Sequence, residues 1–242
     1  MALTPRLRLA AELCGSPHAV IDVGCDHAYL CVQLIEQGVQ HAFASDIRPG
    51  PLEAAKETIR AAGLEDRITP MLCSGLEAFG PEDADAIVIC GMGGETIAEI
   101  LAAAPWTAAG KHKLILQPMT QAPRLRKWLR ENGYAIRQER LAKEGKRLYC
   151  LLEVWGGEHD PHAADYGDFF TESLRKDPLF PAFVQAQTTR YTRILQGQAQ
   201  SEAGICEDEG NAAEILNILK EQAYGIGQPC NRRSGEGTES NP

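Results

Sequence analysis

Short apolar runs alternate with helix-patterned segments from residue 19 to residue 155, and this alternation restricts the fold more than any other feature. Continuous apolar runs are typical of strands that are buried on both faces of a parallel sheet. The expected strands are residues 19–23, 42–46, 68–72, 86–90 and 114–117, closed by an antiparallel pair at 135–137 and 149–155. The pattern predicts an α/β class with a doubly wound sheet.

The segments between the expected strands contain residues that are typical of the starts and ends of helices. Helices are expected over residues 27–37, 96–104 and 124–132. Another helix is expected between Pro51, near its first turn, and Gly63, just past its end. Helices in these positions would cover both faces of the sheet.

The chain changes character after Trp155. Residues 156–161 read GGEHDP and are typical of a linker, whereas residues 180–199 and 211–224 each carry one apolar face. Two such helices favour an αα-hairpin. We therefore divide the chain into a first domain at 1–156, a helical hairpin domain at 163–224 and a disordered tail at 225–242.

Several classes of protein are excluded by simple patterns. The N-terminus lacks the apolar stretch of a secretion signal, and no run of about 18 apolar residues could span a bilayer. We therefore expect a cytoplasmic protein with no membrane partner. None of the 8 cysteines forms a CxxC pair, so neither a zinc site nor a redox dithiol is predicted, and no metal is expected.

The charge of the chain is unevenly distributed. The net charge is −9, yet residues 111–147 hold 11 basic and 3 acidic side chains. The candidate RNA-binding residues on the helix expected there are Arg124, Arg126, Lys127 and Arg130, and a later turn adds Lys143, Lys146 and Arg147. Such a surface would neutralise the phosphates of a nucleic acid. The alternative interpretation is an ordinary solvated helix face.

The ends of the first two expected strands carry a candidate cofactor site. Gly24 follows the first strand, where the lack of a side chain lets a ligand approach the backbone. Asp46 ends the second strand, where a carboxylate can accept hydrogen bonds from two ribose hydroxyls. The spacing from Asp22 to Asp46 fits one βαβ half-unit. A tight turn and a solvated strand end are the alternatives.

The sign of the charge beside Gly24 narrows the choice of nucleotide. A dinucleotide fingerprint requires GxGxxG, which presents backbone N–H groups to a pyrophosphate. This chain has Cys25 and Asp26 after the glycine, and Asp26 would repel an anion. A cationic sulfonium cofactor would be attracted instead, which favours S-adenosylmethionine over NAD.

A glycine-rich segment, GMGG, follows the fourth expected strand. Gly91 and Gly93 flank Met92, and the missing side chains would let a flat substrate lie against the main chain. The alternative is a flexible connection between strand and helix.

These motifs together carry a specific resemblance. DVGCDHAYL after the first strand, GMGG after the fourth and LILQPM on the fifth resemble the bacterial tRNA adenine-22 N1-methyltransferase family, over about residues 3–155. The resemblance implies a Rossmann-like class I methyltransferase fold, S-adenosylmethionine as the methyl donor, the D-arm of tRNA as the acceptor, and a helical, coiled-coil-like C-terminal domain. The cofactor-binding residues that we assign are Asp22, Gly24, Asp46, Ile47, Ser74, Gly75 and Gly91.

One position departs from the family pattern. Many relatives carry Asp-Gly where this chain has Ser74-Gly75, the pair expected beside the adenine of the cofactor. A serine hydroxyl accepts a hydrogen bond from an amine more weakly than a carboxylate does. We therefore expect this position to affect cofactor affinity.

The candidate catalytic residues are Asp26 and His27. N1 of adenine already has an in-plane lone pair, so the enzyme has to extract, align and shield the base. A carboxylate that accepts from N6 would stabilise the positive charge left by methylation, and we assign this role to Asp26. Its alternative role is the N-cap of the helix expected at His27. His27 orients the base or is simply a first-turn helix residue.

Other functions stay open at this point. Arg6, Met92 and Gly93 are the remaining candidates for contact with the substrate, and Arg6 is equally explained as a solvated side chain. A methyltransferase acting on a small molecule would use the same cofactor site. A tRNA-binding protein that keeps the fold without turnover is the non-enzymatic alternative.

Overall fold

The computed structural model describes residues 3–157, 169–198 and 212–225. The chain divides into two compact units, residues 1–180 and residues 181–242. The tail predicted to be disordered lies, apart from its first residue, outside the described residues, as does most of the predicted linker.

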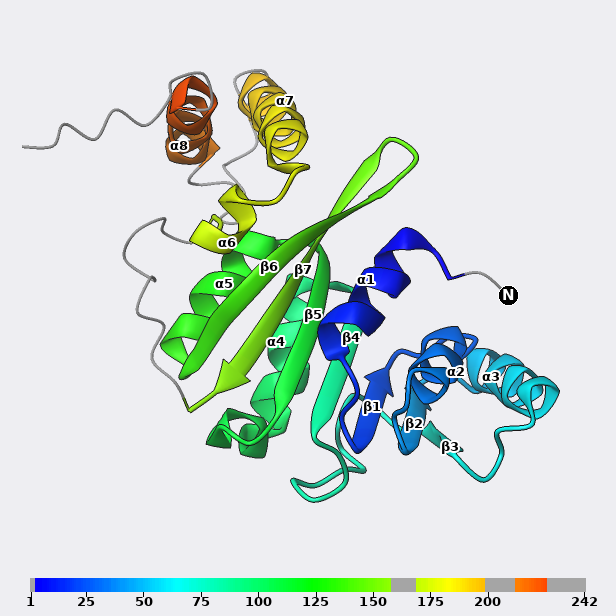
Figure 1. Cartoon of the computed structure of the whole chain (residues 1–242). Coiled ribbons are helices and arrows are strands. Elements are labelled where there is room, and N and C mark those ends of the chain that lie inside the picture. The colour runs from blue at the N-terminus through cyan, green and yellow to red at the C-terminus, as the bar shows by residue number, and fades with distance from the viewer. Residues whose placement is uncertain (1–2, 158–168, 199–211, 226–242) are drawn as a thin grey trace, which may run out of the picture. The chain divides into compact units, whose positions relative to one another are not determined.

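A seven-stranded sheet in the order β3-β2-β1-β4-β5-β7-β6 forms the centre of the first unit (Figure 1). The strands are β1 (Ala19–Val23), β2 (His41–Asp46), β3 (Ile68–Leu72), β4 (Ala86–Gly93), β5 (Lys113–Thr120), β6 (Tyr134–Glu144) and β7 (Arg147–Gly156). The first five pair in parallel, whereas β7 is antiparallel to both β5 and β6. The predicted α/β fold with a closing antiparallel pair is confirmed.

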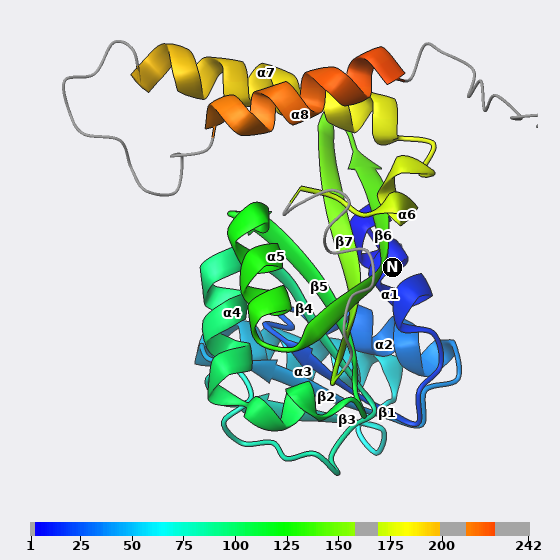
Figure 2. The same ribbon diagram turned by 90° about the vertical axis from the view of Figure 1, so that its left-hand side faces the viewer.

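Helices cover both faces of the sheet (Figures 1 and 2). One layer holds α1 (Pro5–Cys14), α2 (Tyr29–Glu36) and α3 (Pro49–Ala62), and the other holds α4 (Gly94–Ala103), the 3-10 helix η1 (Pro105–Ala109) and α5 (Ala122–Glu131). Alternate residues of β1 pack into opposite layers, Val20 with the first and Ile21 with the second. This two-sided burial explains why the strand is apolar except at Asp22.

The predicted bounds of the last strands were too short. β6 and β7 form a long hairpin joined by a two-residue turn, in which Gly145 adopts φ +58°. Polar and charged residues interrupt the apolar ones in this hairpin, for example the exposed Lys143 beside the buried Ala142. A search for continuous apolar runs misses such a strand because only part of it faces the core.

Helix α1 was not among the expected elements, although its start is marked in the sequence. Thr4 is the N-cap, its Oγ1 accepts the N–H of Leu7 at 3.4 Å, and Pro5 occupies the first turn. The predicted start of α2 was two residues too early, because the helix begins at Tyr29 and not at His27. The intervening turn lies beside the functional site described below.

Residues 169–180 belong to the first unit, so the predicted start of the hairpin domain at residue 163 lies too early. This segment contains α6 (Glu172–Arg175) and is bonded to the outer strand β6. Ser173 Oγ accepts the N–H of Glu139 at 2.8 Å, and Asp177 Oδ2 accepts the N–H of Leu141 at 2.9 Å. The side chains thereby satisfy backbone groups on β6 that would otherwise form an open sheet edge.

The second unit contains α7 (Phe180–Gln198) and α8 (Ala212–Gly225), close to the two helices predicted from apolar periodicity. Val184 and Tyr191 on α7 are buried, as are Ile215 and Leu219 on α8. Among the described helices, none is long and apolar enough to cross a membrane.

Candidate active site

A cleft of about 940 Å³ opens at the carboxyl ends of β1, β2 and β4. From β1 the chain continues to β2 on one side, whereas β4 pairs with β1 on the other side. The carboxyl end of β1 is therefore the switch point of the sheet, the place where ligands bind in open α/β folds. The predicted site residues that line the cleft are Arg6, Asp22, Gly24, Asp26, His27, Asp46, Ile47, Ser74, Gly75, Gly91 and Met92. Residues from five separate segments of the chain therefore meet here.

The turn after β1 requires glycine at position 24. Gly24 adopts φ +76°, and a Cβ placed there would lie 2.4 Å from Cε of Met92. The backbone N–H groups of Gly24 and Cys25 both donate to the carbonyl of Ser45, at 2.8 and 2.9 Å. This pair of hydrogen bonds fixes the turn against β2, and the absent side chain keeps the cleft open.

Asp22 brings a buried carboxyl group to the floor of the cleft. It is 4% exposed, and the thiol of Cys31 lies 3.6 Å from its Oδ2. Burial raises the pKa of Asp22 to about 7, and the nearby Asp46 adds to the rise. A cation bound in the cleft would favour the ionised form of Asp22, so the site is matched to a positively charged ligand.

Asp46 is held in one orientation at the end of β2. Its Oδ1 accepts the backbone N–H of Arg48 at 2.9 Å, and the Arg48 guanidinium Nε lies 3.6 Å from the same oxygen. Asp46 lines the cleft although it is only 4% exposed. A fixed carboxylate at this strand end is suited to hydroxyl donors such as those of a ribose.

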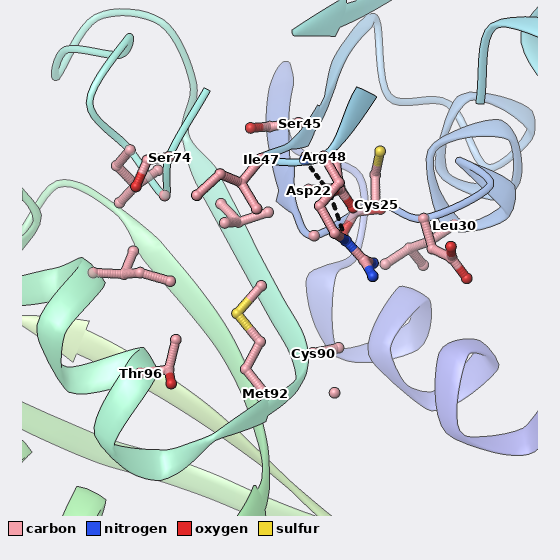
Figure 3. A pocket seen from close by; sticks show the side chains of 18 of the residues that line it. Asp22, Cys25, Leu30, Ser45, Ile47, Arg48, Ser74, Cys90, Met92 and Thr96 are labelled. Carbon is pink, nitrogen blue, oxygen red and sulfur yellow. Dashed lines mark hydrogen bonds and ion pairs between the residues drawn. The ribbon is translucent and has the colours of Figure 1, made fainter. Parts of the chain in front are cut away.

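Apolar and small residues form the part of the cleft beyond Asp46. Ile47 is 65% exposed, which is unusual for a large apolar side chain. Figure 3 shows Ile47 and Met92 pointing into the same space, with Ser74 and Thr96 along one side and Leu30 on the other. An aromatic ring inserted here would cover Ile47, and the Ser74 hydroxyl provides a polar group at its edge.

The turn between β1 and α2 holds two residues other than glycine in the left-handed region. Asp26 has φ +51° and Ala28 has φ +57°. For alanine this backbone costs about 1–2 kcal/mol, a kind of strain that is concentrated at functional sites. Ala28 is the N-cap of α2 and no side-chain cap bond forms, so the alternative role of Asp26 as a helix cap is wrong.

The side chains of this turn face the cleft and the solvent. The Asp26 side chain is 66% exposed, and its Oδ2 lies 3.9 Å from Nε2 of His27. The His27 ring stacks on Tyr29 with 5.4 Å between centroids. All three residues line the cleft, so a carboxylate and a stacked ring pair border the same opening.

The GMGG segment is more ordered than expected. Residues 91–93 continue β4 with a break in register against β5, so they are not a flexible connection. Gly91, with φ +84°, leaves room for Arg6, whose Nη1 would lie 3.0 Å from a Cβ. Gly93 does not line the cleft and packs near Thr120, and a Cβ on Gly94 would lie 2.6 Å from the carbonyl of Gln121. Within the GMGG segment only Gly91 and Met92 line the cleft, and the Arg6 guanidinium lies in the space beside Gly91.

Gln117 is a site residue that the sequence analysis missed. It is fully buried on β5, and its Oε1 accepts both Nη1 of Arg6 at 2.8 Å and the N–H of Gly91 at 3.1 Å. The Arg6 guanidinium lies 5.4 Å from the ring centroid of Tyr149. A glutamine inside the apolar run LILQPM was the signal for a buried polar contact. Arg6 is therefore held in place at the cleft, and it is not a freely solvated side chain.

The basic helix α5 forms only part of the predicted surface, because Arg124, Lys127 and Arg130 are exposed but Arg126 is not. Arg126 is 5% exposed and pairs with the buried Glu139, so it cannot reach a phosphate, and its assignment to RNA is wrong. Burying this charge requires such a partner, which Glu139 supplies. Arg124 pairs with Glu95, and none of the four cations on α5 lines the cleft.

The residues around the cleft fit S-adenosylmethionine. The buried carboxyl group of Asp22, the fixed acceptor at Asp46 and the exposed apolar side chain of Ile47 suit a cation joined to a ribose and a flat base. Among residues 3–157, 169–198 and 212–225, no group of three or more His, Cys, Asp or Glu side chains is placed to hold a metal ion.

Comparisons with known proteins agree with this arrangement. Residues 3–152 match a family described as a methyltransferase domain. The tRNA (adenine(22)-N(1))-methyltransferase of Bacillus subtilis is 37% identical over 232 residues, which cover 91% of this chain and 97% of the relative.

Two solved structures resemble the chain over almost its whole length. The M. capricolum protein TrmK in complex with S-adenosyl-homocysteine is 26% identical with a TM-score of 0.75, covering 93% of this chain and 100% of that chain. Streptococcus pneumoniae Sp1610 in complex with S-adenosyl-L-methionine is 29% identical with a TM-score of 0.75, covering 92% and 100%. The protein therefore belongs to the methyltransferase domain family and, within it, to the tRNA (adenine-22-N1)-methyltransferases.

Proposed function

We propose that this chain transfers the methyl group of S-adenosylmethionine to N1 of adenine 22 in the D-arm of tRNA. The observation that carries the proposal is the cleft at the switch point of the sheet, whose floor is acidic and whose strand-end carboxylate is fixed, in a chain 37% identical to a tRNA (adenine(22)-N(1))-methyltransferase. A tRNA substrate also supports the cytoplasmic location expected from the sequence.

The cofactor is assigned to the side of the cleft formed by β1, β2 and β3. Asp46 would accept the ribose hydroxyls, and Ile47 would lie against the adenine. Ser74 and Gly75 follow β3 and border the same region, so Ser74 is placed to accept a hydrogen bond from the adenine amine. Gly24 leaves space near Asp22, and these two residues would hold the charged part of the cofactor.

The acceptor adenine is assigned to the side formed by α1, the turn before α2 and the end of β4. Arg6, Asp26 and His27 line this part of the cleft together with Met92. The exposed edge of the stacked His27–Tyr29 pair offers a flat surface to an extruded base. Arg6 would contact the nucleotide, because Gln117 and Tyr149 hold its guanidinium at the cleft.

The chemistry requires alignment more than proton transfer. When bound, S-adenosylmethionine supplies an electrophilic methyl group on a sulfonium, and the lone pair of adenine N1 forms the new C–N bond as the C–S bond breaks. The methylated ring carries a positive charge, which makes its N6 amine a stronger donor. Asp26 would accept a hydrogen bond from N6 and stabilise that charge as it develops.

The proposal is tested with labelled S-adenosylmethionine and two unmodified tRNA transcripts, one with adenine and one with guanine at position 22. We expect 1-methyladenosine at position 22 in the first transcript and no product in the second. Asp26→Asn keeps the shape of the side chain and is expected to lower the rate by on the order of 100-fold, with an unchanged dissociation constant for the cofactor. A methyl group on N6, on another nucleotide or only on free adenosine would refute the proposal.

A further inference from the structure

We propose that the turn of the β6–β7 hairpin is an RNA-binding arm, in which Lys143, Lys146 and Arg147 contact tRNA phosphates beside the cleft. This inference rests on the proposed function and specifies how the substrate is held. Lys143, Lys146 and Arg147 are called the hairpin cations below.

The cations of the basic segment, residues 111–147, differ in whether they are free to contact a phosphate. Arg126 is buried against Glu139, and Arg124 is paired with Glu95 on α4. Arg140, on β6, lies 3.3 Å from Glu12 of α1. These arginines already have carboxylate partners within the protein. On α5, Lys127 and Arg130 are also exposed, but neither they nor the other cations of that helix line the cleft.

The hairpin cations are all exposed, and among the residues that the structure describes none has an ion-pair or hydrogen-bond partner for its side chain. The acidic residue of the turn, Glu144, does not neutralise them. Its Oε1 accepts the backbone N–H of Arg6 at 2.8 Å, which directs the carboxylate toward α1. The end of the hairpin thus presents three positive charges to solvent.

The hairpin reaches the cleft through α1. The Glu144–Arg6 bond joins the turn to α1, and the Arg6 side chain lines the cleft and lies over the ring of Tyr149 on β7. Tyr149 is two residues from Arg147, a separation of about 7 Å along a strand. In both views the hairpin extends beyond the rest of the sheet on the side of α1 (Figures 1 and 2). A nucleotide that enters the cleft would leave its flanking phosphates close to the hairpin cations.

The chemistry of the turn favours RNA over a protein partner. Residues 143–147 read KEGKR and contain no apolar side chain, whereas the buried centre of a protein interface is apolar and poor in lysine. Contacts to phosphates need only cations and position a nucleic acid without reading its sequence. Residues 1–110, which supply most of the cleft, hold 15 acidic and 6 basic residues, so the hairpin is a local site of attraction for a polyanion beside it.

The test replaces the hairpin cations by alanine and measures tRNA affinity by fluorescence anisotropy between 50 and 200 mM salt. Each lost contact is expected to reduce the slope of log K against log salt by about 0.7–0.9, so three contacts reduce it by about 2–3. Over this fourfold range of salt, the affinity of the unaltered protein should fall roughly 20- to 40-fold more than that of the triple variant. Calorimetry with S-adenosylmethionine should give the same dissociation constant for both.

A matched control removes the same charge elsewhere. Lys56→Ala, Arg60→Ala and Lys111→Ala together alter the partly exposed Lys56 and two exposed side chains, none of which lines the cleft. This triple variant should keep the salt slope of the unaltered protein. An equal loss in both triple variants would show a general effect of net charge and would overturn the proposal.

The outcomes separate this inference from the function on which it rests. If tRNA is methylated at adenine 22 but the hairpin variant binds it with an unchanged salt slope, the hairpin proposal is wrong and the function stands; the charges would then belong to another partner, such as an acidic protein. If the hairpin variant loses its salt-dependent affinity while no methyl transfer occurs with the unaltered protein, the RNA-binding arm stands and the proposed function fails.

Discussion

Lowering the pH from 8 to 6 is expected to raise the dissociation constant of S-adenosylmethionine by about tenfold through Asp22. The variant Asp22→Asn should lack this tenfold contribution. The reason is the buried carboxyl of Asp22, whose pKa is raised to about 7 by burial. At pH 8 about nine-tenths of the Asp22 side chains are ionised, and at pH 6 about one-tenth. A cation in the cleft binds the ionised form, so its affinity follows this fraction.

The assay is calorimetric titration at pH 6, 7 and 8 with both proteins in the same buffers. Asp22→Asn retains the size of the side chain but has no carboxyl to titrate. Since the α-amino group of the cofactor titrates near pH 8 in both experiments, the ratio of the two dissociation constants isolates Asp22. An identical pH dependence in the two proteins, or a wild-type affinity that rises as the pH falls, would refute the reasoning.

Thermal unfolding without cofactor gives a second readout with the opposite sign. Because the pKa of Asp22 is higher in the folded protein than its ordinary value of 3.8, the folded state binds the proton more tightly. The stability that this provides is fully present below pH 3.8 and is lost as the pH rises through about 7. The melting temperature of the unaltered protein should therefore fall relative to that of Asp22→Asn between pH 5 and 8, and equal changes would contradict the assignment.

Three further changes test separate parts of the account. Gly24→Ala forces alanine into φ +76° with its Cβ 2.4 Å from Cε of Met92, so calorimetry should show at least a tenfold loss of cofactor affinity, and an unchanged affinity would argue against close approach to this turn. Arg126→Met leaves Glu139 buried without its cationic partner and should lower the free energy of unfolding by about 3–5 kcal/mol in urea titrations. Adding Glu139→Leu should restore much of this loss, and a neutral single substitution would contradict the burial of the pair. Gln117→Leu removes the hydrogen bonds to Arg6 and Gly91 and should lower the rate of tRNA methylation while the dissociation constant of the cofactor stays the same. A loss confined to cofactor binding would instead assign this glutamine to the cofactor side of the cleft.

The fold was predictable wherever strands are buried on both faces. β1 has the bounds expected from the sequence, since a strand covered by helices on both sides is apolar except where, as at Asp22, it contributes to the site. β3 also has the expected bounds, although it lies at the edge of the sheet and its Leu72 is exposed. The turn after β1 and the carboxylate at the end of β2 were found in the same way, because parallel strands bring their carboxyl ends to one edge. The site residues at the ends of β1 and β2 could therefore be predicted from the order of the strands in the chain.

The other half of the site depends on contacts between distant residues. Arg126 and Glu139 are 13 positions apart on different elements, and nothing local in the sequence shows that one neutralises the other. Gln117 holds Arg6 across 111 positions, so the place of Arg6 at the cleft could not be inferred from its neighbours in the chain. A count of charges identified the basic segment, but only the packing shows which of its cations face solvent.

The central claim is that the cleft binds S-adenosylmethionine with Asp46 holding its ribose. The most direct measurement is calorimetric titration of the unaltered protein and of Asp46→Ala with S-adenosylmethionine, with melting curves to show that both are folded. Two hydrogen bonds to a carboxylate contribute about 1.5–3 kcal/mol each, so we predict saturable binding by the first protein and at least tenfold weaker binding by the second. Equal affinities, or no heat with this donor and clear binding of a nicotinamide nucleotide, would contradict the claim.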